Sequence, residues 1–353
     1  MKVKKISVRD AIGTVMSHDL TLIDPESGYK GVRFKKGHIV SEDDIAVLKR
    51  MGRERLSVLE LNHGEVHEDD AALRVADALG ASGEKGDALF SIKGPSEGKC
   101  VLIAEETGLL LFDEDMVHRV NARDEWALAT LPNKIPVSKG ETVAAWRVGP
   151  LAVKEEAVRH AESCLGSSSF GLIPFRPLKT ALVTTGREIF EGRVKDFFLP
   201  KLVKKLALYG APLIGHDVVS DDTEAIKQSI AAWLSKGAEV VLCTGGMSVD
   251  ADDVTPSAIQ EAATEVIFKG VPVLPGSNLM LAVNADPEDG GRRVLLGVPA
   301  CAVHSEFTAL DTIMHRVYAG LLPTKDEVRR WGVGALCRKC AACNYPTCRF
   351  GCR

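Results

Sequence analysis

A glycine turn followed by acidic residues is the segment of this sequence best suited to chemistry. An apolar run leads into Thr244-Gly245-Gly246, and Ser248, Asp252 and Asp253 follow. Two adjacent glycines let backbone N–H groups approach a ligand closely, and such groups suit phosphate oxygens. The carboxylates that follow are of the kind that hold a divalent cation against a phosphate. The segment therefore predicts a turn that binds a phosphate together with Mg²⁺.

A second group of reactive side chains lies close to the C-terminus. Five of the nine cysteines fall there with the spacing C-x2-C-x2-C-x4-C-x3-C, which is typical of zinc sites and iron–sulfur clusters. The first three match a ferredoxin-type spacing and favour iron–sulfur, although the fourth is offset, so zinc stays an alternative. The predicted metal ligands are Cys337, Cys340, Cys343, Cys348 and Cys352.

Strands and helices that alternate from residue 178 onwards must position the glycine turn. This alternation predicts a parallel sheet with helices on both faces, and ligands of such sheets bind beyond the carboxyl ends of the strands. Thr185-Gly186, Asp221-Asp222 and Gly245-Gly246 each follow a predicted strand, so we expect them at one edge. The predicted strands are 181–184, 213–219, 240–243, 265–268 and 293–296, and the predicted helices are 195–209, 222–236, 255–263 and 300–319.

These segments resemble the molybdopterin-binding domain of molybdenum cofactor biosynthesis proteins. The Thr-Gly-Gly string is similar to the signature of that family, and 184–196 is similar to its opening strand, turn and helix. Val218–Asp222 is similar to its second strand end, and two Pro/Gly turns, 275–278 and 297–300, follow in order. The resemblance implies an α/β fold: a three-layer domain with a parallel-rich sheet, preceded by β-rich α+β accessory regions.

The resemblance also implies roles for individual residues. Glu188, Asp222 and either Asp252 or Asp253 would bind Mg²⁺ or activate water, whereas Pro275, Gly276, Ser277 and Pro299 would shape the far wall. A purely structural interpretation competes with these roles: Gly186 as a turn glycine, Glu188 as a solvated acid, and Asp221 and Asp222 as helix caps. The predicted cofactor-binding residues are Thr185, Gly186, Thr244, Gly245, Gly246, Ser248, Pro275, Gly276, Ser277 and Pro299.

The resembled family carries more than one activity. Its molybdotransferases insert molybdate into adenylylated molybdopterin and release AMP with Mg²⁺, whereas a sister family adenylylates molybdopterin. Here Arg187 replaces the usual aspartate, and Ala300-Cys301 replaces a Gly-Asn pair. These departures favour binding over catalysis, so a non-catalytic cofactor carrier or redox sensor is one alternative. A nucleotide pyrophosphatase of the competence-damage type is another, because that family shares the domain and its Asp-Asp pair.

Composition narrows the range of partners. The 353 residues carry a net charge of −4 and 45% hydrophobic residues, which is typical of a globular protein and disfavours nucleic-acid binding. Neither a membrane span nor a secretory signal is evident, so we expect a cytoplasmic location. The expected partners are molybdopterin or its adenylylated form, molybdoenzymes or other cofactor biosynthesis proteins, and further copies of the chain in a homo-oligomer. The predicted domains are 1–68, 69–165, 178–320 and 337–353.

Overall fold

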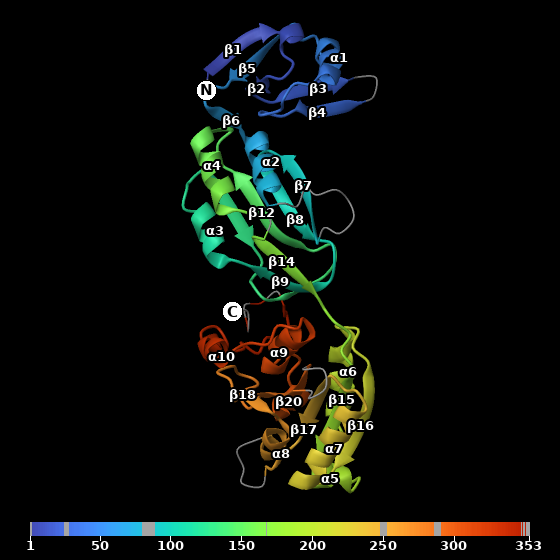
Figure 1. Ribbon diagram of the computed structural model, residues 1–353. Coiled ribbons are helices and arrows are strands. Elements are labelled where there is room, and N and C mark those ends of the chain that lie inside the picture. The colour runs from blue at the N-terminus through green and yellow to red at the C-terminus, as the bar shows by residue number, and fades with distance from the viewer. Residues whose placement is uncertain are drawn as a thin grey trace. The chain divides into compact units, whose positions relative to one another are not determined.

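A computed structural model divides the chain into two compact units (Figure 1). Unit 1 comprises Met1–Glu105, Phe112–Leu131 and Gly140–Gly171, and unit 2 comprises Glu106–Leu111, Pro132–Lys139 and Leu172–Arg353. Among the described residues no helix is long and apolar enough to cross a membrane. The division of the N-terminal half at residue 68 stays a prediction. The structure describes residues 2–24, 28–79, 89–166, 168–247, 253–285, 291–346, 348 and 350.

The N-terminal part of unit 1 packs a small sheet and a hairpin against one helix. The sheet has the strand order β1-β5-β2, and β3 pairs with β4. Helix α1 begins where the Asp44 carboxylate accepts hydrogen bonds from the backbone N–H and hydroxyl of Ser41. Its Leu48 is buried in the core of this part. The elements are β1 Lys2–Ser7, η1 Val8–Asp10, β2 Val15–Met16, β3 Leu20–Asp24, β4 Tyr29–Phe34, α1 Glu42–Arg50 and β5 Arg55–Glu60.

The remainder of unit 1 is a four-stranded antiparallel sheet, of order β10-β12-β8-β7, packed against helices. Two buried indoles fix this packing, because Trp126 donates to the carbonyl of Ala157 on α4 and Trp146 donates to that of Ala72 on α2. Arg74 of α2 also pairs with Glu155 and Glu162 of α4. The elements are β6 Glu65–His67, α2 Glu68–Ala78, β7 Phe90–Ser96, β8 Lys99–Ala104, α3 Glu114–Val120, β10 Trp126–Thr130, β12 Thr142–Val148, β13 Ala152–Lys154 and α4 Glu155–Cys164.

A six-stranded sheet of order β16-β15-β17-β20-β19-β18 forms the centre of unit 2. Strands β16, β15, β17 and β20 run parallel, whereas β19 and β18 are antiparallel to their neighbours. The strands are β15 Thr180–Thr185, β16 Leu213–Val219, β17 Val240–Thr244, β18 Glu265–Lys269, β19 Met280–Ala285 and β20 Arg292–Val298. A smaller sheet of order β11-β9-β14 comprises β9 Gly108–Phe112, β11 Pro136–Val137 and β14 Phe170–Pro174.

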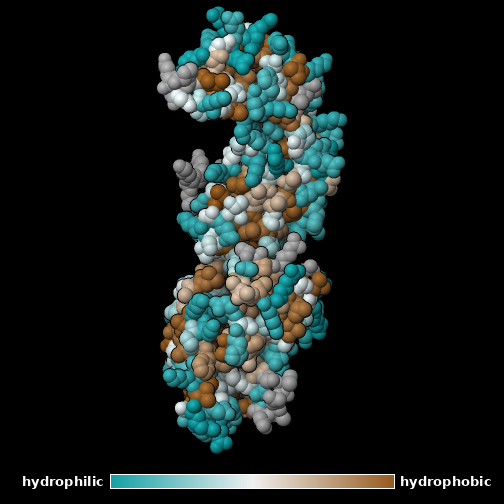
Figure 2. Space-filling model, turned by 180° about the vertical axis from the view of Figure 1, so that it is seen from behind, coloured by the Kyte–Doolittle hydropathy of each residue, from teal (hydrophilic) through white to brown (hydrophobic). Residues whose placement is uncertain are grey.

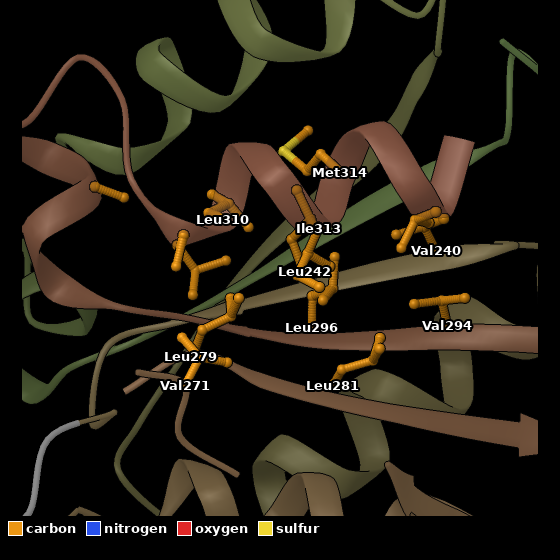
Figure 3. Packing of buried hydrophobic residues seen from close by; sticks show 14 of the residues in the cluster. Val240, Leu242, Val271, Leu279, Leu281, Val294, Leu296, Leu310, Ile313 and Met314 are labelled. Carbon is orange, nitrogen blue, oxygen red and sulfur yellow. The ribbon is translucent and has the colours of Figure 1, made fainter. Parts of the chain in front are cut away.

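Helices cover both faces of the large sheet, so the predicted three-layer, parallel-rich α/β arrangement is confirmed. On one face Leu310, Ile313 and Met314 of α9 lie against Leu242 and Leu296 (Figure 3). On the other face α7 and α8 pack against a second apolar cluster. The helices are α5 Arg187–Phe190, α6 Phe198–Ala207, α7 Thr223–Ser235, α8 Thr255–Ala262, η2 Ala300–Val303, α9 Ala309–Tyr318, α10 Lys325–Arg329 and η3 Arg330–Gly332.

Two sequence predictions in unit 2 need correction. The predicted helix 300–319 is divided into the 3-10 helix η2 and the helix α9. The division arises because Thr308 is extended and caps α9, while Asp311 bonds back to the N–H of Thr308. The antiparallel strand β19 was absent from the prediction, since its apolar run lacks a following helix to mark it. The predicted strands at 265–268 and 293–296 correspond to β18 and β20.

Candidate functional site

The carboxyl ends of the parallel strands meet at one edge of the large sheet. The register pairs Thr184 with Thr244, Thr244 with Val298, and Thr185 with Val219, so these strands end at nearly the same level. The turns that follow them therefore lie along a common edge, as the alternation of elements predicts. The structure thus brings together the turns after β15, β16, β17 and β20.

The glycine turn approaches β15 so closely that no side chain fits. A Cβ atom on Gly245 would lie 2.1 Å from the backbone oxygen of Thr185, and one on Gly246 would lie 2.8 Å from the hydroxyl oxygen of Thr255. Both glycines also have positive φ, 85° and 51° respectively. Only glycine combines this backbone conformation with this approach. The close approach of the turn to β15 therefore requires glycine at both positions.

A carboxylate with one buried oxygen lies beside this turn. Oδ1 of Asp253 lies 3.6 Å from the position of a Cβ on Gly246, and Oδ2 is buried without a hydrogen-bond partner among the described residues. The hydroxyls of Thr185 and Thr255 lie 3.0 Å apart and share one hydrogen bond, so one of their two hydrogens remains for another acceptor. A buried carboxylate oxygen without a partner is costly, which indicates a place for a cation or a donor.

The other predicted acids mainly organise the backbone. Oδ1 of Asp222 accepts from the N–H of Ala225 at 2.8 Å and caps α7, as the structural interpretation predicts. Oδ2 of Asp221 accepts from the N–H of Arg187 at 2.8 Å, which ties the end of β16 to the turn after β15. Glu188 is exposed on the short helix α5.

The charge of Arg187 is paired with Glu191 at the end of α5. Its guanidinium lies 2.8 Å from the carboxylate of Glu191, and this hydrogen bond raises its pKa. Gly186, which precedes it, has a φ of 136° and begins α5.

Sequence reasoning missed a polar cluster on the opposite face of the same edge. The hydroxyl of Thr184 donates to Oδ2 of Asp196 at 2.8 Å and lies 2.9 Å from Nε2 of His216. Thr244 in turn donates to Thr184 at 3.1 Å, while Oδ1 of Asp196 accepts from the N–H of Phe198, the first residue of α6. The register places His216 beside Leu182, on the α6 and α9 face. This cluster fixes Thr244, the residue directly before the glycine turn.

The predicted far wall lies at the same edge, because Met280 at the start of β19 pairs with Gly297 near the end of β20. Gly276 packs tightly: a Cβ there would lie 2.6 Å from the N atom of Ala309, and the carbonyl of Pro275 accepts from that N–H. The backbone carbonyl of Ser277 accepts a hydrogen bond from the N–H of Val271.

Pro299 is buried at the end of β20 and precedes η2. Ser248 and Asp252, two further predicted site residues, lie outside the described residues.

The cysteine segment begins beside the far wall. The N–H of Cys337 donates to the carbonyl of Leu274, one residue before the Pro275-Gly276 turn. Tyr345 stacks on Phe307, and its hydroxyl lies 2.9 Å from Nε2 of His315. Among the described residues no three histidine, cysteine or acidic side chains are grouped so that they could hold a metal ion, and Cys352 lies outside them.

The four cysteines outside the C-terminal segment differ in burial, because Cys164 and Cys301 are half-buried. Cys100 and Cys243 are buried. Burial raises the pKa of Cys243 to about 12 and that of Cys100 to about 11, so both thiols stay protonated.

The fold and this edge define an α/β domain with a candidate ligand site at the carboxyl ends of its parallel strands. Residues 181–317 match the family described as "Probable molybdopterin binding domain". The match confirms the resemblance that the sequence motifs predict for this segment. Residues 5–60 match a second family, described as a domain of unknown function.

The curated relatives include molybdenum cofactor proteins and CinA-like proteins. The molybdopterin molybdenumtransferase of Synechococcus elongatus is 27% identical over 37% of this chain and 34% of that protein. The molybdenum cofactor synthesis protein cinnamon of Drosophila melanogaster is 25% identical over 54% of this chain and 32% of that protein. A CinA-like protein of Amoebophilus asiaticus is 28% identical over 23% of this chain and 20% of that protein. The chain thus spans about a third or less of the length of these relatives.

Two solved structures that resemble this chain share less sequence identity with it than these curated relatives do. The tungsten cofactor synthesizing protein MoaB of Pyrococcus furiosus is 17% identical over 40% of this chain and 92% of that chain, with a TM-score of 0.34. A molybdenum cofactor biosynthesis protein of the same organism is 14% identical over 91% of this chain and 65% of that chain, with a TM-score of 0.25.

Proposed function

We propose that unit 2 binds molybdopterin or its adenylylated form at the carboxyl edge of its parallel strands. The observation that carries the proposal is the buried Oδ2 of Asp253, which has no partner among the described residues and lies beside Gly246. The glycine turn offers backbone N–H groups to a phosphate, and the hydroxyls of Thr185 and Thr255 add a polar wall. A phosphate, its counter-cation and a polar heterocycle would find complementary groups along this edge.

The proposed reaction is insertion of molybdate into adenylylated molybdopterin with release of AMP. Asp253 would hold Mg²⁺ together with phosphate oxygens of the substrate, and the ion would neutralise charge on those oxygens when bound. The predicted Asp222 and Glu188 do not form a three-carboxylate group with Asp253 among the described residues. The glycine turn would orient the phosphates, and the Pro275-Gly276 turn would close the far side. In this reaction a water oxygen bonds to phosphorus as the phosphoanhydride P–O bond breaks, so AMP leaves and molybdopterin keeps its own phosphate.

A non-catalytic cofactor carrier is the second candidate. Its support is that Oδ1 of Asp222 caps α7 rather than facing a cation, and that Arg187 pairs with Glu191 rather than facing a phosphate. The cysteine segment 337–352 would then carry zinc or an iron–sulfur cluster and dock on a molybdoenzyme or another cofactor biosynthesis protein. In either case we propose a cytoplasmic homo-oligomer.

Measurement of AMP release distinguishes these functions. Purified protein is mixed anaerobically with adenylylated molybdopterin, with and without Mg²⁺ and molybdate. The insertase proposal predicts molybdate-dependent AMP release that falls at least about tenfold in Asp253→Asn, because the neutral amide attracts a cation much less. Asp326→Asn on α10, whose carboxylate is exposed, is the matched control. Binding without AMP release supports the carrier, whereas AMP released from ADP-ribose supports a pyrophosphatase.

A further inference from the structure

A basic cavity lies in the N-terminal part of unit 1, outside the molybdopterin-binding domain. It measures about 350 Å³, and its polar lining includes Lys5, His18, Arg53, Arg55 and Ser57. We propose that this cavity is a binding site for a tetrahedral oxyanion, either free or as the phosphate of a monoester. Its volume lies near the lower end of the range for small-molecule sites, so it exceeds a free oxyanion and leaves room for the organic part of a monoester.

The fold of this part brings the basic side chains together. In the antiparallel register Lys5 lies opposite Ser57, and Ser7 lies opposite Arg55, so Lys5, Ser57 and Arg55 share one face of the β1–β5 ribbon. The N–H of Arg53 donates to the carbonyl of Leu48, which fixes the backbone just before β5. The pairing of β1 with β5 thus brings Lys5, Ser57 and Arg55 together, and the chain after α1 places Arg53 beside them.

His18 is oriented toward the same cavity by a short chain of hydrogen bonds. The hydroxyl of Ser17 donates to the carbonyl of Ser57 at 2.8 Å, and the same oxygen lies 2.9 Å from Nδ1 of His18. Because that hydroxyl hydrogen is used toward Ser57, the Ser17 oxygen acts as the acceptor and Nδ1 as the donor. Nε2 of the neutral ring is then an acceptor, so it would contact the P–OH hydrogen of a singly protonated phosphate rather than a phosphate oxygen.

No described residue forms an ion pair with the basic side chains of the cavity. None of its described lining residues is acidic, and none of Lys5, Arg53 and Arg55 forms an ion pair with a described residue. Neighbouring Lys4, by contrast, lies 3.7 Å from the carboxylate of Glu60, outside the cavity. Like charges gathered in one concavity repel one another, and a bound dianion removes that cost.

The base of the cavity is apolar and fixed. Met16 and Leu20 line it and are buried in the core of this part, 1% and 4% exposed. A low-dielectric wall on one side strengthens the attraction between the guanidinium groups and an anion. Arginine also binds oxyanions through two parallel N–H donors, so Arg53 and Arg55 supply geometry as well as charge.

The surface around the cavity favours a small anion over a nucleic acid. The described lining residues include no tyrosine, phenylalanine or tryptophan on which a base could stack. Across the face drawn in Figure 2, hydrophilic and hydrophobic residues alternate in small patches. The lining thus offers positive charge and hydrogen-bond donors without a surface on which a base could stack.

Calorimetric titration of the full-length protein with inorganic phosphate tests this proposal. We expect saturable binding, with a Kd raised at least about tenfold in the double variant Arg53→Gln/Arg55→Gln, since two charge-assisted contacts are lost. Lys4→Gln is the matched control, because it removes one charge from the same strand outside the cavity, and its Kd should match that of the wild type. AMP release by the double variant should be unchanged, which keeps this test separate from the site in unit 2.

Competition with AMP distinguishes the two sources of the oxyanion. If AMP displaces phosphate and binds more tightly in wild type but not in the double variant, the ligand is a phosphate monoester; if it does not compete, the site takes a free oxyanion. Phosphate binding that does not saturate, or that is equal in wild type and in the double variant, would overturn the proposal. Tighter binding of a labelled single-stranded DNA that is lost in the same variant would also overturn it.

Discussion

Replacing Gly245 by alanine separates two physical effects at the glycine turn. The positive φ of 85° is disfavoured for an L-residue and costs about 1–2 kcal/mol. The added Cβ would also lie 2.1 Å from the backbone oxygen of Thr185, and relief of that overlap costs about 1–3 kcal/mol more. We therefore expect Gly245→Ala to lower the free energy of unfolding of unit 2 by about 2–5 kcal/mol.

Gly237→Ala is a matched control for this prediction. Gly237 follows α7 with a φ of 87°, but a Cβ there would meet nothing within 4 Å. Its replacement should therefore cost only the conformational part, about 1–2 kcal/mol. The difference between the two variants measures the close approach of the turn to β15.

Hydrogen exchange followed by mass spectrometry is the appropriate assay, because the chain has two units and local stability must be assigned to strands. Peptides from β15 and β17 should exchange faster in Gly245→Ala than in Gly237→Ala. Affinity for adenylylated molybdopterin should fall at least about tenfold in Gly245→Ala only, because the displaced turn misplaces its N–H groups. Equal exchange and equal affinity in the two variants would refute the account of the turn.

Two further predictions concern the polar groups that hold unit 2 together. Burial lowers the pKa of His315 from 6.5 to about 3, so the unfolded chain binds more protons between these values. Stability should fall as the pH drops below 6.5, by up to about 1.4 kcal/mol per pH unit, and calorimetry of wild type and His315→Gln would test whether that slope belongs to this residue. Glu327→Gln should cost about 3–5 kcal/mol in urea unfolding, because it leaves the guanidinium of Arg316, 4% exposed, without its paired charge. Asp326→Asn, whose exposed carboxylate pairs with Arg329, should cost no more than about 1 kcal/mol, and equal losses would contradict this assignment.

Local patterns predicted the sheet better than they predicted the site. Alternation of apolar runs with helical spacing identified four parallel strands and three of the helices, because each element carries its own period. The break at Thr308 was missed because a helix cap inside an apolar stretch leaves the overall hydrophobic pattern intact. The strand β19 was missed because it returns antiparallel, without the helix that marks a parallel crossing.

The site residues depended on contacts that no local pattern encodes. The sequence left Asp252 and Asp253 as alternatives, and the structure describes only Asp253, with its buried oxygen beside Gly246. The cluster of Thr184, Asp196 and His216 joins a strand end, a loop and the middle of another strand. Only the register of β15 against β16 brings these residues together, so sequence spacing gives no signal for them.

The most direct test of the central claim is an equilibrium titration of the anaerobic protein with adenylylated molybdopterin in the presence of Mg²⁺. The proposed site predicts saturable binding in the wild type and in Gly237→Ala. It predicts an affinity reduced at least about tenfold in both Gly245→Ala and Asp253→Asn, which alter the turn and the buried carboxylate separately. Binding that is absent from the wild type, or unchanged in both variants, would contradict the claim that this edge of the sheet holds the cofactor.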